Sequence, residues 1–438
     1  MDRRNFLKAG LPTGAALTAV AATTTPPLRA AQSSSRILNV EDFGAKGDGR
    51  ANDTNAIQRA FDKAQSHDCI YFPLGEYRVT NTVSLPPSVS VRVTGDGPGS
   101  RIVADADMQD LVRLEHPFRD GIIDYLTIDA NNMAQVALRV VGGSYSRMNE
   151  LDVWKPRDIG IHCGRTDDGK SGVECMITNS RITGMTQRSA EEPGSRLGIL
   201  VGGNWTDGHY NNLIIKGFID TGMELQAASN ILHEVHIYRS PCFQYKHALR
   251  VKGRNTWVAQ SYFDNFTHTG VELLEDNAVL QTCYFLRWEA AFGAGTVYPG
   301  VGIQIGSAET EAKHISIISN GFVCHLPDER RFDVGQPLTA VKMVNARDVI
   351  SRDHTYEGTI TGETTGAGRL EIPAGLNRVS VEHGLLTAPA LVHLTPAGNP
   401  NGVTWWIEEM DDQRFVAHIS KTAGRAMSFF WTANCRAG

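Results

Sequence analysis

The chain has 438 residues, seven cysteines and a formal net charge of −6 at pH 7. It contains no block of basic residues, which argues against a nucleic-acid partner. The cysteines are scattered without C-x-x-C pairs, so we expect buried packing residues rather than a zinc cluster. A chain this long exceeds one ordinary hydrophobic core, unless its fold is an array of repeats.

The first segment, residues 1–31, has the composition of an export signal. Arg3 and Arg4 precede an apolar pair, and a mild apolar run follows from Ala9 to Ala22. That run is too short and too rich in Thr, Gly and Ala for a stable membrane span. The segment resembles a twin-arginine signal peptide. The resemblance implies a periplasmic or secreted protein with no membrane contact beyond export.

A turn-rich loop and a short helix are predicted between Val40 and Ala64. Gly44, Gly47 and Gly49 supply the positive φ angles that such a loop needs. Asp53 or Thr54 is the expected N-cap of a helix that has a single apolar stripe. An amphipathic helix of this kind must lie on a larger hydrophobic body.

The same stretch reads D-F-G-A-K-G-D-G, then N-D-T, then A-I-Q-R-A-F. It resembles the opening of the pectate-lyase-like family, which includes rhamnogalacturonase and epimerase-like proteins and phage tail spikes. The resemblance implies an all-β fold, a right-handed parallel β-helix whose N-terminal end is capped by the helix. The motif carries no catalytic residue, so it does not indicate the reaction. A phosphate-binding loop is disfavoured because the third glycine is missing.

From Cys69 onward, short strand patterns follow one another and one motif recurs. Four of its seven offsets are 23 to 25 residues, about one coil of a β-helix, and three are longer by roughly a loop. A β-sandwich would give a shorter spacing. The motif occurs at Ala137–Val140, Gly160–Cys163, Gly198–Val201, Met223–Gln226, Ala248–Val251, Val271–Leu274, Gly302–Ile305 and Ala340–Met343.

Beyond about Gly368 the repeat stops, and the strand patterns are typical of a small antiparallel β module. We therefore expect a signal peptide at 1–31, a β-helix at 36–368 and a module at 369–438. The module is expected to cover the open end of the β-helix. Its tryptophans, Trp405, Trp406 and Trp431, are interpreted as core residues rather than as a sugar-binding surface.

Candidate site residues come from placing the predicted coils in register. Phe218, Ile237, Phe263 and Phe285 are taken as equivalent inward positions, so their neighbours point outward. The predicted catalytic residues are His236, Tyr238, Arg239, Asp264, Asp220 and Arg287. The predicted substrate-binding residues are Asp152, Trp154, Tyr262, Tyr284, Lys246 and Glu289.

A stripe of aromatic, basic and acidic side chains suits an extended, acidic polysaccharide. In β-elimination, Arg239 or Arg287 would neutralise a uronate carboxylate and His236 or Tyr238 would remove a proton. In hydrolysis, Asp220 and Asp264 would flank the scissile bond. The chain lacks the complete set of motifs that polygalacturonases of this architecture carry. It shows no tight acidic cluster for calcium, so no cofactor is expected, although Ca²⁺ stays open.

The predicted function is therefore that of an exported polysaccharide lyase. A glycoside hydrolase or glycosyl transferase on the same fold is the first alternative. A non-catalytic, glycan-binding β-helix of the tail-spike type is the second. The expected partner is the polysaccharide itself, and the oligomeric state is left open between monomer and homotrimer.

Overall fold

A computed structural model provides the structure of the chain. It describes residues 35–87, 90–115, 118–164, 172–185, 194–238, 246–288, 300–325, 338–352, 354–358, 360–361, 365–383, 385, 388–411 and 413–434. Predictions that fall elsewhere, including the signal peptide, Arg239 and Glu289, lie outside the described residues.

Parallel strands dominate the described residues, and most of them belong to one long sheet of 19 strands. These are β1 (Ile37–Asn39), β2 (Asp48–Asn52), β3 (Cys69–Phe72), β4 (Gly75–Val79), β6 (Arg92–Gly95), β7 (Ser100–Ala104), β10 (Ile122–Asp129), β13 (Arg147–Trp154), β16 (Met176–Thr183), β19 (His209–Lys216), β21 (Ile231–Tyr238), β23 (Trp257–Ala259), β24 (Tyr262–Asp264), β26 (Val279–Gln281), β27 (Tyr284–Trp288), β29 (Ala312–Ile318), β30 (Gly321–His325), β32 (Ala346–Arg352) and β33 (Thr355–Gly358).

A second parallel sheet has 11 strands and a small one has four, counted over the same described ranges. The second sheet comprises β5 (Val83–Leu85), β8 (Met108–Leu114), β11 (Ala134–Val140), β14 (Ile159–Cys163), β17 (Leu197–Val201), β20 (Thr221–Leu225), β22 (His247–Val251), β25 (Thr269–Leu273), β28 (Val301–Ile305), β31 (Leu338–Met343) and β34 (Ile360–Thr361). The small sheet comprises β9 (Phe118–Arg119), β12 (Gly143–Ser144), β15 (Gly172–Val173) and β18 (Trp205–Thr206).

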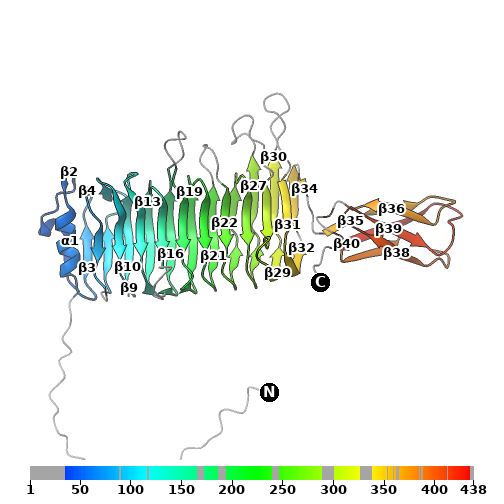
Figure 1. Cartoon of the computed structure of the whole chain (residues 1–438), viewed down its shortest axis with the longest axis horizontal. Helices are drawn as coiled ribbons and strands as arrows, with labels where there is room; N and C mark the ends of the chain where they lie inside the picture. Colours follow the sequence, from blue (N-terminus) through cyan, green and yellow to red (C-terminus); the bar gives the residue numbers. More distant parts are fainter. Residues whose placement is uncertain are drawn as a thin grey trace, which may run out of the picture. The chain divides into compact units, whose positions relative to one another are not determined.

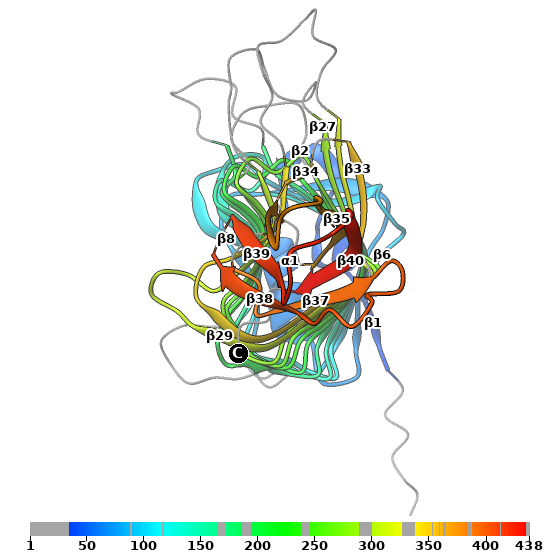
Figure 2. The ribbon, with the colours of Figure 1, turned by 90° about the vertical axis from the view of Figure 1, so that its right-hand side faces the viewer.

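The chain alternates between the long sheet and the second sheet, so that each coil contributes strands to both. Figure 1 shows the strands of successive coils side by side, and Figure 2 shows the coils behind one another. Every pairing within these sheets is parallel, as between β21 and β24. The predicted fold class, a parallel β-helix, is confirmed.

Alternation along each strand sends every second side chain into the interior. In the long sheet, Ile215, Ile237, Phe263, Phe285 and Phe322 occupy the same inward position in successive coils. The rings of Phe285 and Phe322 stack with centroids 5.0 Å apart, and Phe263 lies 5.3 Å from Phe285. Stacking of like side chains between coils supplies the core that no single coil could form alone.

This register corrects one sequence-based alignment. The residue equivalent to Ile237 is Ile215 and not Phe218, because β19 ends at Lys216 and Phe218 lies in the following turn. Phe218 is buried like a core residue, which explains why the apolar pattern was misread. In the corrected register Asp220 does not belong to the outer row of the long sheet. It lies just before the start of β20.

Small residues line the facing position of the second sheet because the interior is narrow. A Cβ atom on Gly270 would lie 2.7 Å from the Phe285 ring, and one on Gly302 would lie 2.6 Å from the Phe322 ring. The predicted motif is off by one residue in two coils, because Met223 pairs with Ile199 and Val271 with Leu249. The positions equivalent to Gly198 are therefore Gly222 and Gly270.

One residue in each coil bends the strand of the long sheet by adopting a left-handed backbone conformation. In Asn179 and Asn212, φ is 51° and 50°, and the side chain of Asn212 donates a 2.9 Å hydrogen bond to that of Asn179. Asparagine tolerates this conformation better than most residues. The register places the following residues at the same bend: Tyr125, Glu150, Asn179, Asn212, Glu234, Gln260, Thr282 and Ser319.

The predicted N-terminal helix is α1 (Thr54–Lys63), which follows a 3₁₀ turn, η1 (Val40–Phe43). Its apolar stripe is buried, and Phe61 packs edge-on against Phe72 of the first coils. Asp53 occupies the N-cap position, as predicted, but its carboxylate accepts hydrogen bonds from the backbone N–H groups of Lys46 and Gly47. Thus Asp53 holds the glycine-rich loop against the helix. The three loop glycines have positive φ angles, as predicted.

The C-terminal residues form two antiparallel three-stranded sheets. One comprises β35 (Thr365–Ile372), β37 (Leu391–Pro396) and β40 (Met427–Asn434), and the other β36 (Arg378–Glu382), β38 (Trp405–Met410) and β39 (Arg414–Ile419). Strand β35 crosses the domain boundary that was predicted between residues 368 and 369. We refer to β35 to β40 as the C-terminal module.

The C-terminal module has a hydrophobic core of its own. Trp431 packs edge-on against Phe415, and Trp405 packs on Phe429 while its Nε1 donates to the Leu394 carbonyl. The prediction that the tryptophans form the core is right for these two. It is wrong for Trp406, which is 44% exposed and stacks on His418.

Among the described cysteines, Cys163, Cys175, Cys283 and Cys324 are buried, Cys69 is partly buried, and all five are thiols rather than disulfides. Burial raises the pKa of the Cys175 thiol to about 11. These residues therefore act as packing residues, as predicted. In the part of the chain that the structure covers, no helix has both the length and the apolar character needed to cross a membrane.

Candidate functional site

Five of the predicted site residues converge on the outer face of the long sheet. We call them the aromatic patch: His236 and Tyr238 on β21, Tyr262 and Asp264 on β24, and Tyr284 on β27. The His236 ring lies 4.4 Å from the Tyr238 ring and 4.8 Å from the Tyr262 ring, between centroids. Tyr262 stacks on Tyr284 at 4.9 Å. The parallel register of the three strands explains this convergence.

A titratable pair lies within the aromatic patch. His236 Nε2 is 3.3 Å from Asp264 Oδ2, and Asp264 is 9% exposed. Burial raises the pKa of Asp264, although the hydrogen bond to His236 opposes that effect. Burial and the neighbouring Asp264 raise the pKa of Tyr262 to about 12. The patch also gains a cation that was not predicted, since Lys216 Nζ lies 5.7 Å from the centre of the Tyr238 ring.

Two predicted binding residues, Trp154 and Asp152, occupy positions equivalent to patch residues but lie three coils away from them. Trp154 pairs through Thr183 and Lys216 with Tyr238, and Asp152 is in the row of His236. Three coil spacings amount to about 14 Å. Asp152 is bound by the Arg181 guanidinium at 2.7 and 2.6 Å. Neither residue therefore contacts the patch.

Arg287 does not reach the outer face. It is 1% exposed, and a Cβ atom on Gly300 would lie 2.5 Å from Arg287 Nη1. Arg287 pairs with Cys324, which is also buried, so both are inward-facing. The prediction that Arg287 points outward to bind a uronate is wrong, because the residue follows an outward Leu286 in the alternation of β27.

A second group of polar residues gathers where the long sheet turns into the second sheet. Asp220 precedes β20 and Lys246 precedes β22, and Lys246 Nζ lies 3.4 Å from Asp220 Oδ1. Thr221 Oγ1 donates to Asp220 Oδ2 at 3.1 Å. Asp220 and Lys246, which were predicted separately as catalytic and binding residues, thus lie together here.

His247 and Glu272 extend this group onto the second sheet. His247 Nδ1 is 3.3 Å from Glu272 Oε1. Burial lowers the pKa of His247 to about 4, so its imidazole is neutral at neutral pH. Arg250 links two carboxylates, with Nε 2.6 Å from Glu272 Oε2 and Nη1 3.6 Å from Glu224 Oε2. Burial alone would raise the pKa of Glu224, but hydrogen bonds from Gln226 and Lys252 outweigh it and lower the pKa.

His268 completes the group and is its solvent-exposed histidine. Its ring centroid is 5.8 Å from that of His247, its backbone N–H donates to the Lys246 carbonyl, and its Nδ1 lies 2.9 Å from Thr267 Oγ1. Partial desolvation, followed by the positive charge of Lys246, lowers the pKa of His268. We call Asp220, Lys246, His247, His268 and Glu272 the corner cluster.

The aromatic patch and the corner cluster border the same turn. Asp264 ends β24, and only residues 265–268 separate it from β25. In the neighbouring coils the corresponding connections are longer, at 239–246 and 289–300. The patch therefore lies beside the cluster at the shortest of these three connections.

Sequence reasoning missed His247, His268 and Glu272. A usable signal was present for Glu272 alone, in the recurring motif, whose third residue in the correct register points outward from the second sheet. His247 and His268 lie outside that row. That row carries charge in most coils: Arg113, Arg139, His162, Leu200, Glu224, Arg250, Glu272, Gln304 and Lys342. The alternating charges of Glu224, Arg250 and Glu272 at this outward position are the pattern that indicates Glu272.

No group of three or more His, Cys, Asp or Glu side chains arranged to hold a metal occurs within the described ranges. Carboxylates of the corner cluster are instead bound by basic groups, as Glu272 is by Arg250. The expectation that no cofactor is needed, with Ca²⁺ left open, stays a prediction.

A family model described as "Rhamnogalacturonase A/epimerase, pectate lyase-like" matches residues 37–290. The chain belongs to this family. The match covers both the glycine-rich loop with α1 and the two surfaces described above.

Relatives of this pectate-lyase-like chain match it over shorter segments. Alginate lyase 7 of Azotobacter vinelandii is 38% identical over 108 residues, which is 21% of this chain and 12% of that protein. A probable glucan endo-1,3-beta-glucosidase of Arthroderma benhamiae is 41% identical over 64 residues, 15% of this chain and 7% of that protein. The matched segments thus span about a tenth of these relatives.

The crystal structure of the Dettilon tailspike protein gp208 superimposes with a TM-score of 0.53 at 11% sequence identity. The superposition covers 91% of this chain and 94% of that one. At such low identity the similarity concerns the fold alone.

Proposed function

We propose that this chain is an exported enzyme that cleaves an acidic polysaccharide by β-elimination at the corner cluster. The observation that carries the proposal is that an exposed imidazole, His268, and the Lys246 ammonium lie on adjacent coils. Their backbones are hydrogen-bonded, and desolvation and then the charge of Lys246 contribute to lowering the pKa of His268. Elimination next to a uronate needs a base for the C5 proton and a cation for the carboxylate. The relatives named above and the polar surface beside the cluster support a polysaccharide substrate.

The reaction follows from the charges of the cluster. Lys246, held by Asp220, binds the uronate carboxylate and so stabilises the negative charge that develops when C5 loses its proton. Neutral His268 accepts that proton, and the C5–H electron pair forms the C4–C5 double bond as the C4–O bond breaks. The imidazolium then returns the proton to the leaving oxygen, so the step balances without another reactant.

The less exposed members of the cluster hold the reacting groups in place. His247 and Glu272 lie behind His268, and Arg250 fixes Glu272. The rings of Tyr238, Tyr262 and Tyr284 provide a surface on which sugar rings stack. A chain that crosses the turn from the aromatic patch would thus present a uronate to Lys246.

Activity assays on the mature protein test this proposal. Polygalacturonate, alginate and a neutral glucan are the substrates, and the ultraviolet absorbance of unsaturated products is recorded beside reducing ends. We expect unsaturated products from a uronate polymer. The His268→Gln and Lys246→Met variants should lose at least about a hundredfold in kcat.

The matched controls are His314→Gln and Lys313→Met on β29, which change an exposed histidine and a lysine outside both surfaces. These should retain activity. If His236→Gln abolishes activity while His268→Gln does not, the chemistry belongs to the aromatic patch. If no glycan is cleaved and the protein still binds one, the tail-spike alternative replaces the enzyme.

Hydrolysis is the second candidate because burial raises the pKa of Asp264. A raised carboxyl pKa is the direction of change that the general acid of a glycosidase requires. Release of reducing ends without unsaturated products, together with loss of activity in Asp264→Asn, would establish this alternative.

Export through a twin-arginine signal at residues 1–31 is part of the proposal, with a periplasmic or secreted product. Replacing Arg3 and Arg4 by Lys should retain the protein in the cytoplasm. Fractionation of cells that express the complete chain measures this directly.

A further inference from the structure

The C-terminal module contains a hollow of about 550 Å³ that is distant in sequence from both surfaces described above. Two segments form its walls: residues 396–403, at the end of β37 and in its connection to β38, and residues 422–428, in the connection from β39 and at the start of β40. Its volume falls in the range of small-molecule sites. The residues that line the hollow indicate which class of ligand it would bind.

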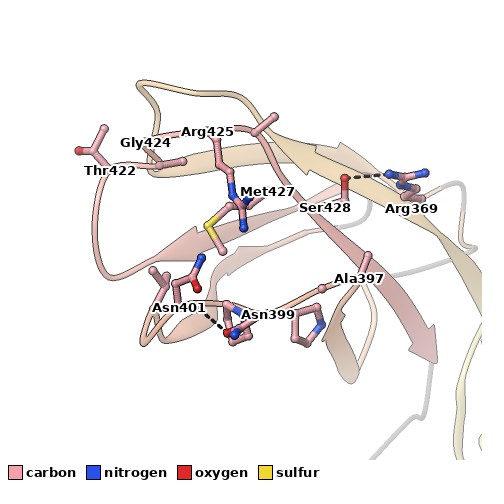
Figure 3. A pocket seen from close by; sticks show the side chains of 15 residues that line it. Arg369, Ala397, Asn399, Asn401, Thr422, Gly424, Arg425, Met427 and Ser428 are labelled. Atoms are coloured by element: carbon pink, nitrogen blue, oxygen red, sulfur yellow. Dashed lines mark hydrogen bonds between the residues drawn. The ribbon is translucent and has the colours of Figure 1, made fainter.

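Within the described residues, the charged side chains that line the hollow are all basic. Arg369 and Arg425 line the hollow, and no carboxylate does among the residues that the structure describes. Arg369 Nη2 donates to Ser428 Oγ at 3.0 Å, and Ser428 Oγ also lies 3.4 Å from Glu371 Oε2. Figure 3 shows Arg425 reaching from one segment toward Asn401 on the other. The lining thus favours an anion.

Neutral polar and apolar groups complete the lining. The side-chain amides of Asn399 and Asn401 offer both donors and acceptors, as hydroxyl groups of a sugar require. Met427, Val403 and the prolines form an apolar wall, against which the C–H face of a sugar ring can pack. A bare inorganic anion would leave that wall and most of the volume unused.

Hydrogen bonds hold the two segments in position before any ligand arrives. Ser420 N–H donates to the Thr404 carbonyl at 2.8 Å, and Thr404 N–H donates to Ser420 Oγ at 3.0 Å. The Ala397 N–H donates to the Ser428 carbonyl at 2.9 Å. A preformed site loses little entropy on binding.

We infer that this hollow is a non-catalytic binding site for an anionic sugar unit, a uronate within a polysaccharide. Arg425 binds the carboxylate, Asn399 and Asn401 bind hydroxyl groups, and Met427 supports the ring. Such a site attaches the protein to an acidic glycan independently of the chemistry on the β-helix. The inference goes beyond the proposed function, since it stands whether or not the corner cluster is catalytic.

Hydrogen–deuterium exchange on the full mature chain tests the inference, because it reports the two regions separately. The probes are a short galacturonate oligomer, its methyl ester and inorganic phosphate. We expect the oligomer to protect residues 396–403 and 422–428, with little effect of the ester or of phosphate. Protection within residues 246–272 reports on the corner cluster and is scored independently.

Two variants test whether Arg425 binds the carboxylate. Arg425→Gln should weaken the affinity measured at the module peptides by at least about tenfold, since a charge-assisted hydrogen bond is lost. Lys421→Gln is the matched control, because it removes one exposed charge that does not line the hollow. Equal protection by the ester or by phosphate, or unchanged affinity of Arg425→Gln beside the control, would overturn the inference.

Discussion

His247 and His268 show how position alone can set the chemistry of one residue type. The two rings are 5.8 Å apart, yet the His247 side chain is 15% exposed and lies 3.3 Å from Glu272, whereas His268 is exposed to solvent. Both pKa values are lowered, so both rings are neutral at neutral pH. The partly buried His247 ring can serve the structure while the exposed His268 ring meets a substrate.

The pH dependence of stability follows from His247. Its pKa falls from the usual 6.5 to about 4 on folding, so the unfolded chain takes up a proton first as the pH falls. Stability from this residue is therefore full above pH 6.5 and is lost on acidification toward pH 4. In His247→Gln, the acid-induced loss in the free energy of unfolding should be smaller by about 2 to 3 kcal/mol.

Urea unfolding at pH values of about 7 and about 4.5 measures the effect. The exposed His314→Gln is the control, because it should retain the wild-type acid dependence. An unchanged dependence in His247→Gln would show that the His247 ring already takes up protons in the folded state.

At the scale of elements, the narrow interior decides which residues each strand carries. Large rings such as Phe285 project from the long sheet and meet glycine on the second sheet. The interior of one coil has room for one large side chain at this position. The facing strand of the second sheet therefore carries a small residue there. This complementarity explains why small residues recur at one inward position of the second sheet.

Filling that space should destabilise the protein. In Gly270→Ala the new Cβ would lie 2.6 Å from the Gly302 carbonyl and 2.7 Å from Phe285, so we expect a loss of about 1 to 3 kcal/mol. Gly424→Ala is the control, since nothing lies within 4 Å of the point that its new Cβ would occupy and its cost should stay within about 0.5 kcal/mol. Chemical unfolding of both variants measures the difference, and similar midpoints would contradict the packing argument.

The same elements show what the sequence could and could not reveal. Alternation and the recurring motif predicted the β-helix and the convergence of His236, Tyr262 and Asp264, because parallel register keeps equivalent residues together. Register errors of one to three residues followed wherever a second apolar residue imitated the inward one, as Phe218 and Met223 did. His247 and His268 were missed because the corner cluster joins residues on both sides of a turn, and no periodic pattern marks a turn.

At the scale of the whole molecule, the β-helix and the C-terminal module each have a separate hydrophobic core. No residue is shared between the two clusters in the described ranges. Cores without shared residues can lose their packing separately. The two parts should therefore respond differently to a mutation in one of them.

Phe415→Ala tests this expectation, because Phe415 is fully buried in the module core and contacts Trp431. We expect a local loss of about 3 to 5 kcal/mol. Hydrogen exchange should accelerate in residues 405–431 and stay unchanged in residues 122–318. Acceleration in both regions would mean that the parts unfold together.

Parallel pairing between coils has a mechanical consequence. The backbone hydrogen bonds that join one coil to the next run across the strands, which places them along the direction in which coils are stacked. Tension applied along that direction would load successive coils in series, so that each level carries the full force with only its own bonds. Under such a load the β-helix would open one coil at a time, and a stretched molecule should lengthen in steps of about two dozen residues.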